Sequence, residues 1–250
     1  MIYAWDVTIP PLTGEKKRRA YIYLPDFYYA EPDRRFPVLY MFDGHNVFFD
    51  SDAAFGKSWG LNRYMGWSKK PLIIVAVECN KEGGRLSEYS PVNFENGSLG
   101  KIEGKGKAYM DWLVKDLKPF IDANYRTLSD RRHTIVCGSS MGGLMALYAA
   151  LRYNDYFGRA ACLSPSLWVA PEKLGRLFDK SIIQGDTRIY MDYGSEELGN
   201  HDKNREALNA AVRLLRRKRI DLGFRIIPGG SHCEASWEKQ IPIFMEWLGL

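Results

Sequence analysis

The segment Thr134-Ile-Val-Cys-Gly-Ser-Ser-Met-Gly-Gly143 carries the clearest fold signal in this sequence. It joins a short apolar strand to a helix rich in Ala and Leu at residues 144–153. Within it, Gly138-x-Ser140-x-Gly142 has the spacing of a nucleophile elbow, a tight strand-to-helix turn that presents a serine at the end of a sheet. Glycines two residues before and after the serine let neighbouring backbone pass without a Cβ clash. The pattern predicts Ser140 as a nucleophile, the alternative being a Gly-rich turn that only caps a helix.

Apolar and β-branched runs on both sides of this segment alternate with segments of helical periodicity. The runs expected to be strands are residues 19–24, 37–42, 72–77, 134–137, 159–163, 188–193 and 224–227. The segments expected to be helices are residues 107–121, 144–153, 206–219 and 237–247. This alternation predicts an α/β fold, a mostly parallel central sheet with helices on both faces. The early strands, which no helix separates, predict an antiparallel edge.

The chain shows no linker, composition break or internal repeat, so we expect residues 1–250 to form one domain. The 24 residues between the strands at 159–163 and 188–193 are too few for a large helical cap domain. Residues 79–106 are rich in Gly, Asn, Ser and Lys and predict a long surface loop, a feature that is often functional.

Composition excludes several classes of protein. Of the 250 residues, 46% are hydrophobic and 26% are charged, which is an ordinary globular balance. The formal net charge of +5 is too small for a nucleic-acid-binding surface.

Four cysteines without a C-x-x-C pair predict free thiols. No apolar run approaches the ~20 residues of a membrane span, and no leader is visible. We therefore expect a cytoplasmic protein, with export after removal of a leader as the alternative.

The chain holds four histidines, of which His232 is the candidate base. It lies in Pro228-Gly-Gly-Ser-His-Cys-Glu234, directly after the last predicted strand, where a loop reaches the same sheet edge as the elbow. It also comes last in the chain, in the hydrolase order of nucleophile, acid and base. His133 precedes the nucleophile strand and His201 lies in a polar stretch, so we expect both at the surface.

The base needs an orienting carboxylate, which this order places between the serine and the histidine. The predicted strand 188–193 ends in Gly194-Ser-Glu-Glu197, so Asp192, Glu196 and Glu197 are the candidates. The position in the loop favours the two glutamates over Asp192, which lies inside the strand. The residues alone leave the choice between the glutamates open.

Two backbone N–H groups are needed to stabilise the oxyanion of a tetrahedral intermediate. One is expected from Met141, the residue after the nucleophile, and the other from the loop after an early strand. Phe42-Asp-Gly-His-Asn46 is such a loop and offers the N–H of His45. The imidazole of His45 is then expected to line the site and not to act as the base.

With these residues in place, the chain resembles the Putative esterase family of α/β-hydrolases, which includes esterase D, carbohydrate esterase family one and the enterobactin esterases. The resemblance extends from about residue 18 to the end of the chain. The segments that carry it are residues 38–46, Arg85 with Glu88-Tyr-Ser-Pro91, residues 138–143, Ser164-Pro-Ser-Leu-Trp168, and His232 with Glu234 and Trp237.

The resemblance implies an α/β-hydrolase fold with a Ser-acid-His triad. In relatives the acid is the fourth residue of a Gly-x-x-Asp/Glu turn, which corresponds to Glu197 here. The oxyanion-hole donors of the family correspond to the amides of His45 and Met141. The chain lacks the His-Gly-Leu-Thr type of loop expected of S-formylglutathione hydrolases, which argues against that activity.

These residues and the resemblance predict a serine esterase that hydrolyses a carboxylic ester through an acyl-enzyme, without a metal or cofactor. Trp59, Trp168 and residues 79–106 are expected to line an open cleft. Such a cleft suits a bulky polar substrate, such as an acylated sugar, a feruloyl or acetyl ester or a siderophore ester, better than a long lipid.

Two alternatives from other classes stay open. An acyltransferase would use the same triad and pass the acyl group to a sugar, and a non-catalytic scaffold would keep only the fold. A serine peptidase of this fold would need a propeller or large cap, for which the chain is too short. The expected partner is a small-molecule ester, with a homodimer as a further possibility and neither nucleic acid nor membrane.

Overall fold

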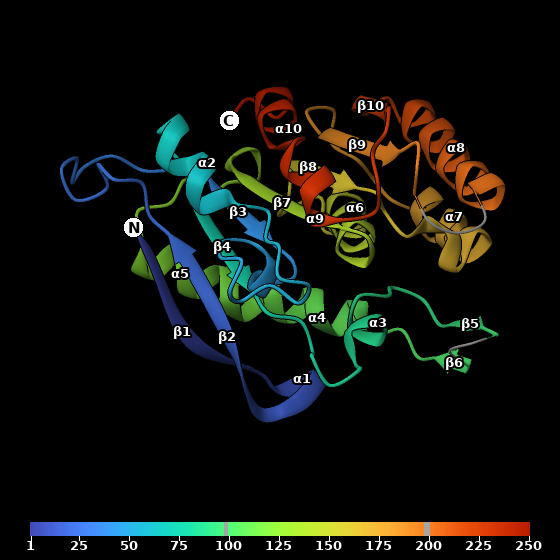
Figure 1. Ribbon diagram of the computed structural model, residues 1–250, viewed down its shortest axis with the longest axis horizontal. Helices are drawn as coiled ribbons and strands as arrows, with labels where there is room; N and C mark the ends of the chain where they lie inside the picture. Colours follow the sequence, from blue (N-terminus) through green and yellow to red (C-terminus); the bar gives the residue numbers. More distant parts are fainter. Residues whose placement is uncertain (98–99, 198–200) are drawn as a thin grey trace.

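A central sheet of eight strands organises the chain, in the order β1-β2-β4-β3-β7-β8-β9-β10 (Figure 1). The computed structural model describes residues 1–97, 100–197 and 201–250. The strands of the sheet are β1 (Ile2–Ile9), β2 (Gly14–Tyr23), β3 (Val38–Met41), β4 (Ile73–Val77), β7 (Thr134–Ser139), β8 (Arg159–Leu163), β9 (Arg188–Gly194) and β10 (Asp221–Ile227). A separate hairpin pairs β5 (Phe94–Asn96) with β6 (Gly100–Ile102).

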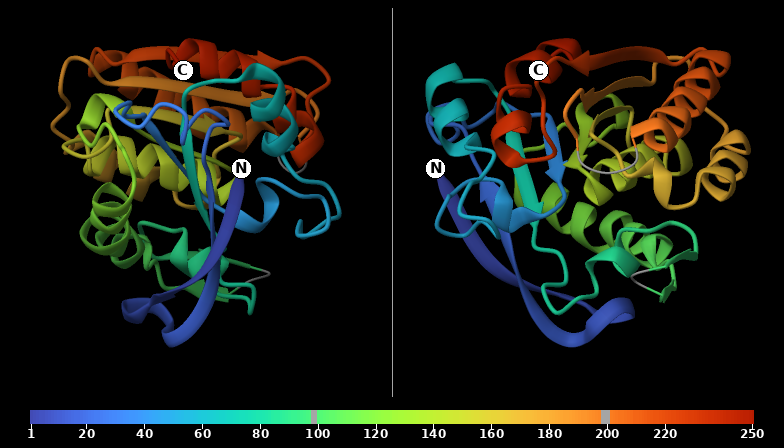
Figure 2. Two further views of the ribbon diagram at one scale, coloured as in Figure 1. Left: turned by 90° about the vertical axis from the view of Figure 1, so that its left-hand side faces the viewer. Right: turned by 45° about the vertical axis from the view of Figure 1, so that its right-hand side comes forward.

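The sheet is parallel from β4 to β10 and antiparallel at one edge, as predicted. Strand β3 pairs in parallel with β4 and β7, and parallel pairing continues through β8, β9 and β10. Strand β2 runs antiparallel to β4, and β1 antiparallel to β2. The ribbon of β1 and β2 lies at one end of the molecule, and β10 with α8 lies at the other (Figures 1 and 2). Because β3, β7, β8, β9 and β10 are parallel, the loops that follow them all lie at the carboxyl ends of the strands, which we call the carboxyl edge of the sheet.

Helices cover both faces of the sheet, because the inner strands are apolar at nearly every position and successive side chains point to opposite faces. One face of the sheet, with Ile22, Val75 and Val136, packs against a first set of helices. The opposite face, with Ile74, Ile135 and Tyr190, packs against a second set. The first set is α4 (Gly106–Trp112), the π-helical turn η2 (Leu113–Leu117), α5 (Lys118–Asn124), α6 (Met141–Arg152), α7 (Pro171–Asp179) and α8 (His201–Arg217). The second set is α2 (Leu61–Ser68), α9 (Glu234–Glu238) and α10 (Ile241–Trp247).

Short elements complete the chain and include several that the sequence pattern did not predict. They are α1 (Pro10–Thr13), α3 (Arg85–Glu88) and the 3₁₀ turns η1 (Gly44–Asn46), η3 (Arg131–His133) and η4 (Leu167–Val169). Strand β1 was missed because it is an edge strand with a single fully buried residue, so its apolar signal is weak. The expected helix over 237–247 is divided into α9 and α10, and Pro242 lies in the first turn of α10, where its missing N–H is tolerated.

The connection from β8 to β9 consists of η4 and α7, so no cap domain stands over the carboxyl edge of the sheet. The expected surface loop over 79–106 contains α3 and the β5–β6 hairpin. The four cysteines are free. In residues 1–97, 100–197 and 201–250, no helix is both long enough and apolar enough to cross a membrane. The assignment of residues 1–250 to one domain stays a prediction.

Candidate active site

Ser140 occupies the tight turn between β7 and α6, with φ 58° and ψ −123°. A positive φ is strained for a residue other than glycine, and it persists only where the surroundings enforce it. A Cβ on Gly138 would lie 2.5 Å from the carbonyl carbon of Gly142, and one on Gly143 would lie 2.6 Å from the carbonyl oxygen of Leu163. The glycines therefore allow the strand, the turn and the helix to approach this closely.

The hydroxyl of Ser140 lies beside the segment that follows β8. Its Oγ is 3.3 Å from the Oγ of Ser166, and the N–H of Ser166 bonds the Ser140 carbonyl at 3.0 Å. Ser140 is half-buried, so its side chain is open to a ligand.

His232 and Glu197 meet at the same edge of the sheet, on the segments that follow β10 and β9. The Nδ1 atom of His232 lies 2.8 Å from Oε2 of Glu197. The Glu197 carboxylate is buried, and its Oε1 accepts hydrogen bonds from the N–H of Gly194 at 2.8 Å and from the hydroxyl of Ser164. Both oxygens of this carboxylate thus have partners, as the burial of a charge requires.

The other two candidate carboxylates lie elsewhere. Glu196 is exposed, and its backbone N–H bonds the carbonyl of Gly230 at 2.9 Å. Asp192 is buried inside β9 and accepts hydrogen bonds from the N–H of Ser164 at 3.2 Å and the hydroxyl of Tyr190 at 3.0 Å. Burial raises the pKa of Asp192 to about 7. Of the three, Glu197 is the one that faces the imidazole.

His133 and His201, which the sequence placed at the surface, are not seen to contact His232 or Glu197 in the described part of the chain. His133 is in η3, just before β7, at the end of that strand opposite to Ser140. Its Nδ1 lies 2.7 Å from Oδ2 of Asp130. His201 begins α8, and its side chain is outside the described part of the chain.

The two expected oxyanion donors both occupy the start of a helical turn. Met141 is the first residue of α6, and His45 is in η1. Backbone N–H groups at the first positions of a helical turn have no partner within that turn, so both amides are available to an anionic oxygen. The approach of η1 to the sheet requires glycine, because a Cβ on Gly44 would lie 2.7 Å from the carbonyl carbon of Val77.

An ion pair between the buried Asp43 and the half-buried Arg85 supports the turn that carries His45. Asp43 has φ 55°, a strained conformation. Its two carboxylate oxygens accept hydrogen bonds from Nε and an Nη of Arg85, each at 2.7 Å. Its backbone N–H bonds the hydroxyl of Tyr89 at 3.1 Å. Burial alone would raise the pKa of Asp43, but the Arg85 guanidinium outweighs burial and holds this pKa below its ordinary value.

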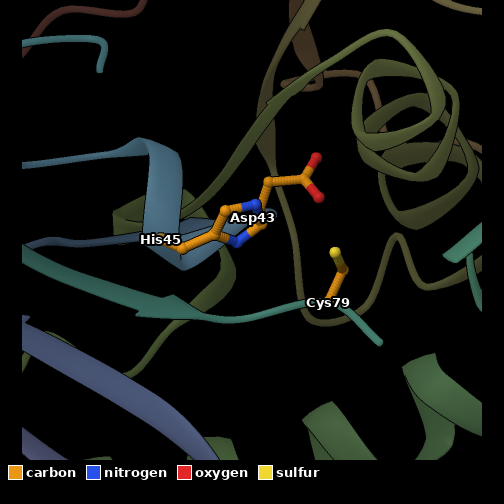
Figure 3. A group of neighbouring side chains, drawn as sticks. All are labelled: Asp43, His45 and Cys79. Atoms are coloured by element: carbon orange, nitrogen blue, oxygen red, sulfur yellow. The ribbon is translucent and has the colours of Figure 1, made fainter. Parts of the chain in front are cut away.

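Asp43, His45 and Cys79 form a buried group whose possible ligand atoms lie within 4.8 Å of one another (Figure 3). Burial lowers the pKa of His45, and its Nδ1 has no hydrogen-bond partner among the described residues. Arg85 already engages both Asp43 oxygens, and burial raises the pKa of the Cys79 thiol, which disfavours the thiolate that a metal needs. These groups fit the wall of a pocket better than a metal site.

Ser140 and His232 lie between two pockets and line both. The larger, of about 930 Å³, is bordered by the loop after β3, by parts of residues 52–55 and 79–86, and by the start of α9. The smaller, of about 380 Å³, is bordered by the segment after β8 and by side chains from β9 and α8. An ester with its carbonyl carbon at Ser140 therefore has room to extend in both directions.

One expected lining residue is in place and the other is not. Trp168 is 41% exposed and lines the smaller pocket. Trp59 is a correction, because it is 3% exposed and stacks on Trp237 in the core, with ring centroids 6.0 Å apart. Phe55, which sequence reasoning missed, is 84% exposed and lines the larger pocket. Within the expected loop 79–106, only parts of residues 79–86 line the larger pocket.

Sequence reasoning gave no role to Ser164, Ser166 or the Asp43–Arg85 pair. Ser164 and Ser166 directly follow the apolar strand β8, and so reach the edge of the sheet that also holds the elbow. The positional argument that selected His232 applies to them equally. No local signal marks the Asp43–Arg85 pair, because its partners are 42 residues apart.

A model of the family described as Putative esterase matches residues 13–244. The Uncharacterized protein YbbA of Bacillus subtilis is 24% identical over 242 residues, which cover 92% of each chain. The endo-1,4-beta-xylanase/feruloyl esterase of Xylanibacter ruminicola is 27% identical over 231 residues, 90% of this chain but 28% of that protein. The iron(III) salmochelin esterase of Escherichia coli is 39% identical over 77 residues, 30% of this chain and 19% of that one.

Solved structures share the fold at lower identity. The BES protein from Bacillus cereus superimposes with a TM-score of 0.76 at 21% identity, covering 99% of this chain and 94% of that chain. This similarity shows the α/β-hydrolase fold that the sequence predicted.

Proposed function

The chain belongs to the Putative esterase family and is a carboxylic ester hydrolase, and on this premise we propose that Ser140, His232 and Glu197 form its catalytic triad. The observation that carries the proposal is the 2.8 Å contact between Nδ1 of His232 and Oε2 of Glu197, beside the strained Ser140 turn. A carboxylate only accepts hydrogen bonds, so Nδ1 carries the proton of this pair. Nε2 of His232 is then left as the acceptor that a serine nucleophile needs.

The first half of the reaction forms an acyl-enzyme. Nε2 of His232 takes the hydroxyl proton as Oγ of Ser140 attacks the ester carbonyl carbon. The carbonyl electron pair moves to oxygen, and the amides of His45 and Met141 donate to the oxyanion. The imidazolium, stabilised by Glu197, returns its proton to the leaving oxygen as the C–O bond breaks. The alcohol departs, and the acyl group stays on Ser140.

The second half hydrolyses that intermediate. A water molecule gives a proton to Nε2 of His232 and attacks the acyl carbon. The same two amides stabilise the second oxyanion. The proton then returns to Oγ of Ser140 as the acid leaves. Apart from the ester and the water molecule, each step uses only side chains and amides of this chain, so we propose an esterase without a metal or cofactor.

We further propose a bulky polar ester as the substrate, such as an acylated sugar, a feruloyl or acetyl ester, or a siderophore ester. The two pockets beside Ser140 support this choice, because they give room to both the acyl group and the alcohol. Each pocket carries an exposed aromatic side chain, Phe55 or Trp168, on which a sugar or aromatic ring can stack. The names of the feruloyl and salmochelin esterases point the same way.

Hydrolysis of p-nitrophenyl acetate and butyrate tests the nucleophile. We expect the wild-type protein to turn over and Ser140→Ala to fold normally while losing about 10⁴-fold or more in rate, because the members of a triad act as a unit. Ser129→Ala, an exposed serine before β7, is the matched control and should keep the wild-type rate. Wild-type activity in Ser140→Ala, or inertness of the wild-type protein toward every ester tried, would contradict the proposal.

A panel of esters tests the substrate class. Methyl ferulate, acetylated oligosaccharides and a catecholate triester should be hydrolysed with a higher kcat/KM than long-chain acylglycerols. Activity limited to the acylglycerols would overturn the substrate proposal and leave the triad intact. Product analysis with a sugar acceptor distinguishes hydrolysis from acyl transfer. The cytoplasmic location and the homodimer stay predictions.

A further inference from the structure

Ser164, the first residue after β8, has a strained backbone that the mechanism above does not use. Its φ is 44°, a value that residues with a side chain rarely adopt. Its N–H is held by Asp192, whose backbone oxygen lies at 3.1 Å and whose Oδ1 lies at 3.2 Å. The residue is 3% exposed. Glycine would adopt this conformation without strain, so the serine hydroxyl is the feature that needs an explanation.

The hydroxyl of Ser164 connects Glu197 to Trp237. The indole Nε1 of Trp237 lies 2.9 Å from Oγ of Ser164, and Oγ in turn bonds Oε1 of Glu197. An indole N–H only donates, and a carboxylate only accepts. The direction is therefore determined: Trp237 donates to Ser164, and Ser164 donates to Glu197.

Trp237 also contacts the base. Its ring lies edge-on to the His232 imidazole, with centroids 5.1 Å apart and an interplanar angle of 81°. The indole also stacks on the buried Trp59. Trp237 is in α9, which begins two residues after His232. One rigid, 5% exposed side chain thus touches the histidine directly and the glutamate through a hydroxyl.

We propose that Ser164 and Trp237 are positioning residues that hold the Glu197 carboxylate so that Oε2 faces His232. The inference rests on the proposed function. With Oε1 occupied by Ser164 and by the N–H of Gly194, the carboxylate cannot rotate without breaking two hydrogen bonds. Oε2 is left to the imidazole, which needs a fixed carboxylate to keep its proton on Nδ1.

Two substitutions at Ser164 separate positioning from fold maintenance. Ser164→Ala removes the hydroxyl and keeps the strained backbone, whereas Ser164→Gly removes the hydroxyl and relieves the strain. We expect both variants to lose roughly 10- to 100-fold in kcat, the size of one hydrogen bond to a charged group. KM should change by less than about twofold. The thermal midpoint of Ser164→Gly should equal or exceed that of Ser164→Ala, because glycine relieves the backbone strain. Equal losses of kcat at unequal stabilities would show that kcat depends on the hydroxyl and not on stability.

A third substitution tests the path through the hydroxyl. Trp237→Phe keeps an aromatic ring against His232 and removes the N–H, so we expect a severalfold loss in kcat. Because Trp237 acts on Glu197 through Ser164, the double variant Ser164→Ala/Trp237→Phe should be no slower than Ser164→Ala. Matched controls are Ser181→Ala, a buried hydroxyl without a partner among the described residues, and Trp67→Phe, an 80% exposed indole.

The outcomes separate this inference from the proposed function. A Ser164→Ala enzyme with kcat within about twofold of wild type overturns the positioning role, while loss of activity in Ser140→Ala still supports the triad. A kcat restored in Ser164→Gly but not in Ser164→Ala overturns it also, because backbone strain would then set the rate. Retained activity in Ser140→Ala removes the proposed function itself.

Discussion

The loops after β3 and β9 each place a buried carboxylate at a pocket that Ser140 also lines, yet the two carboxylates have different partners. Asp43, in the first loop, has both oxygens bound by one permanent cation, Arg85. Glu197, in the second, gives Oε1 to neutral donors and Oε2 to an imidazole. A permanent cation holds a turn in place, whereas an imidazole gains charge during a reaction. The comparison teaches that the partner, more than the burial, determines what a buried carboxylate does.

Asp192 is the third buried carboxylate at this edge and extends the comparison. The groups that bond it directly are a backbone N–H and a tyrosine hydroxyl. Burial is the largest influence and raises its pKa to about 7, even though these two hydrogen bonds and the charge of Arg225 act in the opposite direction. We therefore expect substitutions at the three carboxylates or their partners to differ in effect. The change at Glu197 should lower kcat, the change at the Asp43–Arg85 pair should lower stability, and the change at Asp192 should alter the pH dependence of stability.

The largest expected effect is at Glu197. Glu197→Gln places an amide against Nδ1 of His232, which favours the wrong tautomer and leaves Nε2 protonated. We expect kcat to fall by about 10⁴-fold with the fold intact, as is typical when a triad acid becomes an amide. Steady-state kinetics with p-nitrophenyl butyrate and a circular dichroism spectrum measure the two parts. Glu196→Gln, one residue earlier and exposed, should stay within about twofold of wild type. A larger loss at Glu196 would reverse the assignment.

The next effect is on stability at the Asp43–Arg85 pair. Arg85→Met leaves a buried carboxylate without its cation and should lower the free energy of unfolding by about 3–5 kcal/mol. Urea denaturation measures this change. Adding Asp43→Asn should recover part of the loss, because the uncompensated charge is then gone. Arg217→Met, which breaks an exposed pair with Asp179, should cost less than about 1 kcal/mol. Equal losses in the two arginine variants would show that the Asp43–Arg85 pair stabilises the fold no more than an exposed pair does.

The smallest effect is a pH dependence at Asp192. Its pKa is raised from 3.8 to about 7 on folding, so the folded chain binds this proton more tightly than the unfolded chain. Its contribution to stability is therefore complete below about pH 4 and is lost as pH rises to about 7. Asp192→Asn cannot titrate and should gain on the order of 2 kcal/mol over wild type between pH 5 and pH 8.

Thermal midpoints across that pH range measure the Asp192 effect. Asp33→Asn, at an exposed site, is the control and should follow the wild-type curve. A constant difference between Asp192→Asn and wild type from pH 5 to pH 8 would show that Asp192 keeps its charge throughout. The contrast with Asp43 and Glu197 would then be wrong.

Features that depend on neighbours in the chain were readable without coordinates. The elbow at Ser140 combines an apolar strand, spaced glycines and a helix within ten residues, and each part constrains the next. The alternation of strands and helices likewise predicted a parallel sheet, and the early strands without an expected helix between them predicted its antiparallel edge. Strand order placed His232 at the correct end of that sheet, because carboxyl ends of parallel strands share one edge. Alone, the sequence thus established the fold class and the candidate nucleophile and base.

Features that depend on contacts between distant segments needed the tertiary structure. The residues alone left Glu196 and Glu197 equal, and the family resemblance pointed to Glu197. The contact of Glu197 with His232 is visible only in the folded turn. Trp59 was expected in the cleft, yet its packing on Trp237 places it in the core. The Asp43–Arg85 pair and the contact of Ser164 with Trp237 join segments 42 and 73 residues apart. No local pattern encodes such contacts, since side-chain direction and burial are settled when the elements pack together.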